Sequence, residues 1–282
     1  MMKVKIGGVP EHFNFPWYLT LKDKLYHKEG INLRWQDFHG GTGQMNTALR
    51  EAEIDLAVIL TEGIVRDIIL GNPSKIVQQF VSSPLIWGVH VAEKAPFTSL
   101  DELRGKRAAI SRMGSGSHLM SYVQAQNMGW DTKVDLRFTE IKNLQGALNG
   151  LPLGVADYFL WEKFTTKPFV DQGVFRRIGE VPTPWPCFVI AARQQFIEEQ
   201  PEALDCILST INQNTAQFKT MDGIAPRLAK RYGQQIQDIE QWLSLTHWTD
   251  QQLYPDQLEL VQQTLRDLDL IPKKANYLDL CM

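Results

Sequence analysis

Short apolar runs alternate with amphipathic segments along most of this chain. Apolar runs of roughly four to eight residues are typical of buried β-strands. We expect strands at residues 4–7, 31–38, 55–60, 76–81, 86–91, 106–110, 134–138, 155–160, 175–178 and 187–192. Strands that alternate with helices indicate an α/β fold with mainly parallel sheets, in which ligands bind at the carboxyl ends of the strands.

The amphipathic segments predict helices with recognisable ends. Residues 17–28 form one predicted helix, which Gly30 ends as a C-cap. Residues 44–51 and 63–70 form two more, and residues 99–102 form a capping box that opens a short helix. From Gln194 onward the apolar spacing predicts an almost wholly helical segment.

Length and charge limit the classes of protein to consider. The 282 residues exceed the roughly 100–200 residues of one domain, which favours two lobes. Lys and Arg number 29 and Asp and Glu 32, with no basic run, so nucleic acid is not an expected partner. No apolar run approaches the length of a membrane span, and we expect no membrane-embedded segment.

The start of the chain and the cysteines bear on compartment and cofactors. Met1 leads directly into the first predicted strand without an apolar leader, so we expect a cytoplasmic protein if Met1 is the native start. If a leader has been removed, a periplasmic or lipid-anchored protein is expected instead. Three scattered cysteines and no CxxC motif indicate neither a disulfide framework nor a metal site, and we expect no cofactor.

Two segments share one plan: a strand, a loop rich in glycine and hydroxyl groups, and a helix. One loop spans residues 40–43 and the other residues 111–117. A helix start offers unpaired N–H groups and a positive dipole end, and glycine lets a ligand approach that backbone. The alternative is an ordinary strand-to-helix turn. The expected ligand contacts in these loops are Gly41, Thr42, Arg112, Gly114, Ser115, Gly116 and Ser117.

Other strand ends carry carboxylates and aromatic rings. Glu62 directly follows a buried strand, where a carboxylate is costly to desolvate without a partner. Purely structural roles are the alternatives to ligand binding: a solvated loop at residues 10–15, a helix cap at Glu62, and core packing for each tryptophan. The expected ligand contacts at these strand ends are Glu11, His12, Phe13, Thr61, Glu62, Trp161, Glu162 and Trp185.

Several of these segments resemble a known family. Residues 31–38, the Gly-Gly-Thr-Gly loop at 40–43 and the Glu-Ile-Asp-Leu-Ala-Val segment at 53–58 look like the first lobe of type II periplasmic binding proteins. That family includes binders of sulfonate, nitrate, taurine and thiamin pyrimidines. The Ser-Leu-Asp-Glu-Leu-Arg-Gly-Lys segment at 99–106 is similar to the start of its second lobe.

A narrower resemblance rests on motifs spread along the chain. They include Pro-Glu-His-Phe at 10–13, Leu-Thr-Glu at 60–62, Ser-Pro-Leu-Ile-Trp at 83–87 and the loop at 111–117. Together with residues 161–165 and 183–185, they resemble a small bacterial and fungal group that has this fold, lacks an export signal and has no known ligand. The iron-binding cysteine motif of the yeast thiamin-pyrimidine synthases is missing, so their chemistry is not carried over.

The resemblance implies a two-lobed fold. Lobe one would comprise residues 1–89 and 193–282, and lobe two residues 90–192, with a ligand cleft between the lobes that closes by a hinge motion.

The leading functional hypothesis is binding of a small polar metabolite in that cleft, without catalysis, for transport or sensing. An ABC permease is an expected partner only if the protein is exported. The alternative hypothesis is a cytoplasmic enzyme of cofactor biosynthesis, because menaquinone-pathway enzymes also use this fold. Glu11, His12 and Glu62 would then be its acid–base groups.

Overall fold

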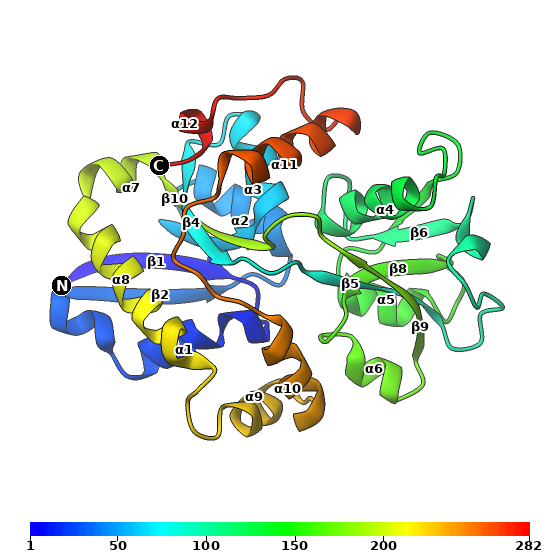
Figure 1. Ribbon diagram of the computed structural model, residues 1–282, viewed down its shortest axis with the longest axis horizontal. Helices are drawn as coiled ribbons and strands as arrows, with labels where there is room; N and C mark the ends of the chain where they lie inside the picture. The colour runs from blue at the N-terminus through cyan, green and yellow to red at the C-terminus, as the bar shows by residue number, and fades with distance from the viewer. The chain divides into compact units, whose positions relative to one another are not determined.

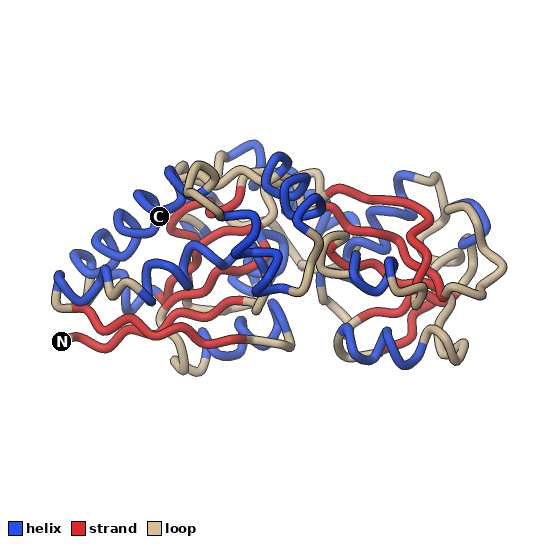
Figure 2. The backbone as a smooth tube through the Cα atoms, turned by 90° about the horizontal axis from the view of Figure 1, so that it is seen from below, coloured by secondary structure: helices blue, strands red, loops and turns tan.

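The computed structural model describes residues 1–282, which fall into two units. Unit 1 comprises Met1–Ser83 and Trp185–Met282, and unit 2 comprises Pro84–Pro184. Each unit is built around one five-stranded sheet with helices packed against it (Figures 1 and 2). No helix combines the length and the apolar character that crossing a bilayer requires.

The sheet of unit 1 has the strand order β2-β1-β3-β10-β4. Its strands are β1 (Met2–Gly8), β2 (Ile31–Asp37), β3 (Leu56–Leu60), β4 (Ser74–Val81) and β10 (Phe188–Arg193). β1 is parallel to β2 and β3, whereas β10 is antiparallel to both of its neighbours. β3 is central and almost wholly apolar, as expected of a strand that is covered on both faces.

The sheet of unit 2 has the equivalent order β7-β6-β8-β5-β9. Its strands are β5 (Ile86–Ala92), β6 (Arg107–Ile110), β7 (Arg137–Glu140), β8 (Tyr158–Glu162) and β9 (Phe175–Pro182). β6 is parallel to β7 and β8, and β5 is antiparallel to β8 and β9. Both sheets therefore combine four strands of one direction with one reversed strand, and the predicted α/β class is confirmed.

Helices cover both sheets and supply most of the C-terminal part of unit 1 (Figure 1). In unit 2 they are η3 (Asp101–Leu103), α4 (Gly116–Asn127), α5 (Leu144–Gly150) and α6 (Lys167–Asp171). In the first part of unit 1 they are η1 (His12–Asn14), α1 (Phe15–Lys22), η2 (Leu25–Glu29), α2 (Gly41–Arg50) and α3 (Thr61–Ile69). Its second part contains α7 (Gln194–Glu199), α8 (Pro201–Phe218), α9 (Ile224–Tyr232), α10 (Ile236–Leu245), α11 (Pro255–Asp267) and α12 (Tyr277–Leu280).

Some predicted elements are wrong in their limits. The single helix expected at 17–28 is divided into α1 and η2, because Lys24 adopts a left-handed conformation with φ 53°. The strand expected at 134–138 begins only at Arg137, and Val134 is 68% exposed. β8 runs from Tyr158 to Glu162, so Glu162 lies within the strand and not after it. Apolar residues in surface turns cause both strand errors, since the apolar pattern alone does not register exposure.

The limits of the two units also differ from the residues expected for the two lobes. The structure divides the chain after Ser83 and after Pro184, whereas the expected divisions followed residues 89 and 192. β5 consequently lies wholly in unit 2, and β10 lies wholly in unit 1. An apolar run predicts a strand but does not reveal which sheet the strand joins, because pairing depends on distant partners.

Candidate functional site

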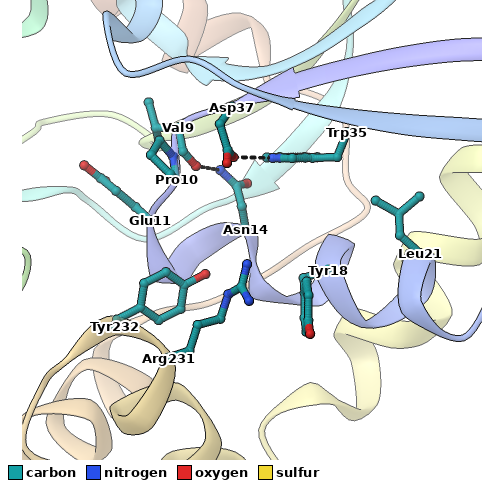
Figure 3. Close-up of a pocket in the computed structure, with 10 residues that line it drawn as sticks. All are labelled: Val9, Pro10, Glu11, Asn14, Tyr18, Leu21, Trp35, Asp37, Arg231 and Tyr232. Carbon is teal, nitrogen blue, oxygen red and sulfur yellow. Dashed lines mark hydrogen bonds between the residues drawn. The ribbon is translucent and has the colours of Figure 1, made fainter.

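A pocket with a cavity volume of about 110 Å³, partly open to solvent, lies in unit 1 at the carboxyl ends of β1 and β2 (Figure 3). The loop after β1 forms one side, and residues of α1 and the end of α9 form the others. The lining residues are Val9, Pro10, Glu11, Asn14, Tyr18, Leu21, Trp35, Asp37, Arg231 and Tyr232. The pocket thus lies where an α/β sheet is expected to bind a ligand.

Glycine at the end of β1 makes room for the pocket wall. A Cβ atom on Gly8 would lie 2.3 Å from the ring of Trp35 and 2.9 Å from Nδ2 of Asn14. Trp35 Nε1 donates to Asp37 Oδ1 at 2.7 Å, and Asn14 Nδ2 donates to the carbonyl of Val9 at 2.9 Å. These two hydrogen bonds hold the indole and the amide over the strand end.

The amide of Asn14 has an unused acceptor. Its side chain is 5% exposed, and its Oδ1 atom is buried without a hydrogen-bond partner. Reversing the amide would place oxygen against the Val9 carbonyl, so the bond from Nδ2 fixes which end is the oxygen. A buried acceptor without a donor is unusual in proteins and calls for a partner that the chain does not supply.

The opposite wall carries a cation and two phenol rings. The Arg231 guanidinium lies 3.9 Å from the ring centre of Tyr18, a close cation–π contact. Burial raises the pKa of Tyr232 to about 12, and the negative charges of Asp37 and Glu11 raise it further, against the opposing effect of Arg231. Tyr232 therefore stays protonated and can donate or accept a hydrogen bond at neutral pH.

Three residues of the loop at 10–15 were predicted to contact ligand, namely Glu11, His12 and Phe13, and of these only Glu11 lines this pocket. His12 is 1% exposed and lies in an aromatic cluster, with ring centres 4.8 Å from Phe13 and 4.4 Å from Trp242. Phe13 packs against Phe188 and Trp242 in the same cluster. Burial lowers the pKa of His12 to about 3, so the imidazole is uncharged at neutral pH.

Glu62 is a second chemically distinctive group of unit 1. It is 2% exposed in the first turn of α3, and its Oε2 atom accepts a hydrogen bond from Trp185 Nε1 at 2.9 Å. Its Oε1 atom has no partner. Burial raises the pKa of Glu62 to about 7, and the Trp185 bond opposes that rise. The structure thus joins two predicted site residues that are 123 positions apart.

The other predicted residues of unit 1 make structural contacts. Thr61 Oγ1 donates to the carbonyl of Pro186. α2 begins at Gly41, three residues before the expected start, and Thr42 is 9% exposed. A Cβ on Gly63 would lie 2.2 Å from Cγ2 of Thr42, so the threonine methyl packs between α2 and α3.

In unit 2 the glycine and serine residues of the 111–117 loop lie close together. Their hydroxyl and N–H groups form hydrogen bonds within the loop and with the first turn of α4. Ser115 Oγ accepts from the His118 N–H at 3.4 Å and caps α4, which begins at Gly116. Ser117 Oγ accepts from the Ser111 N–H at 3.0 Å. The Gly114 N–H donates to His118 Nδ1 at 3.1 Å. These bonds hold the loop in place, and binding of a ligand by its residues stays a prediction.

Two charged residues of unit 2 were also predicted to bind ligand. Arg112 is half-buried, and burial lowers its pKa while the nearby Glu140 opposes that effect. Glu162 is 4% exposed, and its Oε2 atom accepts from the N–H of Thr165 at 2.6 Å and from its Oγ1 at 2.9 Å. Burial raises the pKa of Glu162 to about 7. Trp161 packs against the apolar cluster around Phe159 and Phe175, as its structural alternative predicted.

Most of the pocket residues were missed from the sequence. Trp35 and Asp37 could have been found from the sequence. They lie two residues apart at the carboxyl end of β2, the edge of the sheet where ligands are expected to bind. Arg231 and Tyr232 carry no such signal, because they end an ordinary amphipathic helix nearly two hundred residues after β2. Asn14 was seen only as part of a loop.

Comparison with known proteins identifies the fold. The family model described as Ca3427-like PBP, for periplasmic binding protein, matches residues 87–181. A search of curated proteins finds no match. Among solved structures, the Candida albicans CA3427 gene product, described as having the generic periplasmic binding protein fold, is 23% identical with a TM-score of 0.88. That match covers 98% of this chain and 92% of the other.

Two bacterial proteins of this type are also similar in structure. The periplasmic aliphatic sulphonate binding protein SsuA from Escherichia coli is 20% identical, with a TM-score of 0.76 over 98% of this chain and 95% of the other. PhnD1 from Prochlorococcus marinus, solved in complex with methylphosphonate, is 11% identical, with a TM-score of 0.66 over 95% and 99%. The chain therefore has the periplasmic binding protein fold and resembles the Ca3427-like proteins of that fold.

Proposed function

We propose that this protein binds a small polar metabolite in the pocket of Figure 3 and acts as a transport-type or sensing binding protein without catalysis. The observation that carries the proposal is the pocket itself, where a buried amide oxygen without a partner lines a space bounded by charged and aromatic side chains. The names of structurally similar proteins support it, since SsuA is called a sulphonate binding protein and PhnD1 was solved with methylphosphonate.

Native mass spectrometry of the freshly purified protein, followed by a thermal-shift screen of polar metabolites, tests the proposal. A ligand at a hundred times its Kd should raise the free energy of unfolding by about 2.7 kcal/mol. Leu21→Trp narrows the pocket and should abolish that rise. Leu245→Trp places the same ring on α10, outside the pocket, and should preserve it.

Two results would count against the proposal. If no metabolite is retained and none shifts the unfolding transition at any concentration, a binding role fails. If a ligand binds equally well to the Leu21→Trp variant and the parent, binding takes place elsewhere in the chain.

A second candidate function is catalysis, and Glu62 is the observation that favours it. A pKa of about 7 suits a general acid or base, and one of its oxygens is unpartnered. His12 is less suited, because a pKa of about 3 leaves its buried imidazole uncharged and a weak base at neutral pH. Turnover of a bound metabolite that is lost in Glu62→Gln, with binding retained, would establish this function in place of the first.

A further inference from the structure

We propose that the ligand of the Figure 3 pocket is a small organic cation, a protonated primary amine attached to an apolar or aromatic body. This inference rests on the proposed binding function and specifies its ligand class. The ammonium group would lie at Asn14 and Asp37, and the body would lie along the aromatic wall.

The pocket contains hydrogen-bond acceptors that receive few or no hydrogen bonds from the protein itself. Asn14 Oδ1 is buried and unpartnered, and Asp37 receives one neutral donor, the indole of Trp35. Asp37 pairs in register with Gly8, the residue over which the Asn14 amide lies, so the two acceptors are neighbours. Figure 3 shows the Asn14 side chain extending from the start of α1 toward Asp37. An ammonium carries three donors and no acceptor, which matches this arrangement.

The one cation of the pocket wall is already engaged. Arg231 lies over the ring of Tyr18 at 3.9 Å, and it also lies 5.7 Å from the ring centre of Tyr232. No ion pair joins its guanidinium to Asp37. The lining residues carry two carboxylates and one guanidinium, so the wall has a net negative charge.

The remaining wall suits an apolar or aromatic body. Trp35, Tyr18 and Leu21 line the pocket beside the acceptors. Aromatic faces attract cations as well as apolar groups, so a cationic ligand gains from both kinds of surface. An anion would instead face the carboxylates of Asp37 and Glu11, which outnumber the single guanidinium of the wall. The pocket therefore favours a different charge from that of the sulfonate and phosphonate named for the two bacterial proteins.

Three compounds with one benzene ring, of similar size and different charge, test the inference. We would titrate the ¹⁵N-labelled protein with benzylammonium, benzyl alcohol and benzenesulfonate, and follow the indole N–H signal of Trp35, assigned with Trp35→Phe. That N–H donates to Asp37, so the signal reports on the proposed ammonium position. We expect benzylammonium to bind at least tenfold more tightly than benzyl alcohol, and benzenesulfonate to leave the signal unchanged.

Asp37→Asn removes the charge while keeping an oxygen that accepts the Trp35 bond. This substitution should weaken the binding of benzylammonium at least fivefold and leave the binding of benzyl alcohol unchanged. Asp205→Asn makes the same change on the exposed face of α8, outside the pocket, and should weaken neither compound. The fold of each variant is checked by its indole spectrum.

The outcomes separate the ligand class from the binding function. If benzenesulfonate or benzyl alcohol binds as tightly as benzylammonium, or if Asp37→Asn has no effect, the cation inference is overturned and the pocket remains a binding site. Fragment-sized ligands bind weakly, so the titration extends to about 10 mM. If benzylammonium leaves the Trp35 signal unchanged at that concentration, the inference also fails. If, in addition, no metabolite is retained on purification and none shifts the unfolding transition, the proposed function fails with it.

Discussion

Glu62 and Glu162 lie near the carboxyl ends of corresponding strands in the two sheets. β3 and β8 are each the third strand in order, with a parallel neighbour on one side and an antiparallel neighbour on the other. Each glutamate lies at the carboxyl end of its strand, is almost fully buried, and has a pKa that burial raises to about 7. The shared pKa shows that desolvation outweighs the particular donors at both positions.

Their partners differ. Glu162 accepts two hydrogen bonds from Thr165, three residues further along its own turn. Glu62 accepts one from Trp185, which is remote in sequence, and keeps an unpartnered oxygen. A carboxylate bonded to its own loop stabilises local structure. A buried oxygen left without a donor costs stability, so Glu62 is the better candidate for a functional role.

The largest expected effect on the free energy of unfolding comes from removing the ionisable carboxyl group of Glu62 or Glu162. A carboxyl group with a pKa of about 4.5 in the unfolded chain and about 7 in the folded protein keeps its proton longer when folded. The contribution of each of these groups to stability is therefore most favourable below pH 4.5 and is lost as pH rises to about 7, by about 3 kcal/mol for each group. Glu62→Gln and Glu162→Gln should each remove one such pH-dependent loss, measured by urea unfolding at pH 4.5 and pH 8. A variant whose stability changes between these two pH values by the same amount as that of the parent would contradict the raised pKa of the replaced glutamate.

The next effect distinguishes the two sites. Thr165→Val keeps the side-chain shape but removes the hydroxyl that bonds to Glu162. A hydrogen bond to a charged group contributes about 1.5–3 kcal/mol, so this loss should appear at pH 8 and shrink at pH 4.5, where the carboxyl group is neutral. Thr98→Val is the matched control, because its hydroxyl bonds to the exposed Glu102 and should have a smaller effect. An equal loss in both variants would show that burial does not strengthen the Glu162 bonds.

A third change tests the remote partner of Glu62. Trp185→Phe removes the indole donor, so the pKa of Glu62 should rise above about 7 by about one pH unit. Side-chain ¹³C NMR of labelled glutamate, with Glu62→Gln for assignment, measures the titration. Trp87→Phe is the control, because the buried Trp87 Nε1 has no hydrogen-bond partner and lies in unit 2. A Glu62 titration that is the same in Trp185→Phe and the parent would show that the indole bond does not act on the carboxylate.

The sequence predicts where a residue lies in its strand or helix better than it predicts which distant residue it contacts. The apolar run of β3 places Glu62 at a strand end, and the pattern of α/β alternation predicts the sheets. The bond between Glu62 and Trp185 could not be predicted, because it depends on β10 joining the sheet of unit 1 beside β3. For the same reason the aromatic cluster that buries His12 was not foreseen, since Trp242 lies in a distant helix.

The candidate pocket shows the same limit. Glu11 was predicted as a ligand contact because it follows the first strand, and it does line the pocket. Arg231 reaches the pocket only because α9 packs near α1, and helix packing depends on the whole set of apolar faces. Whether Glu11 and the other predicted site residues bind a ligand stays a prediction.

The smallest expected effect concerns the two helix starts that were predicted to bind an anion or polar oxygen. α4 is capped by the Ser115 hydroxyl, whereas α2 begins after Gly40 without a capping side chain. Ser115→Ala should lower the free energy of unfolding by about 1 kcal/mol, the usual contribution of such a cap. Urea unfolding measures that loss, and Ser209→Ala, a hydroxyl change within the exposed part of α8, is its control. If Ser115 were instead a ligand contact, Ser115→Ala would weaken metabolite binding while leaving the unfolding transition unchanged. A cap predicts the opposite, because the Ser115 hydroxyl then accepts the N–H of His118 whether or not a ligand is present.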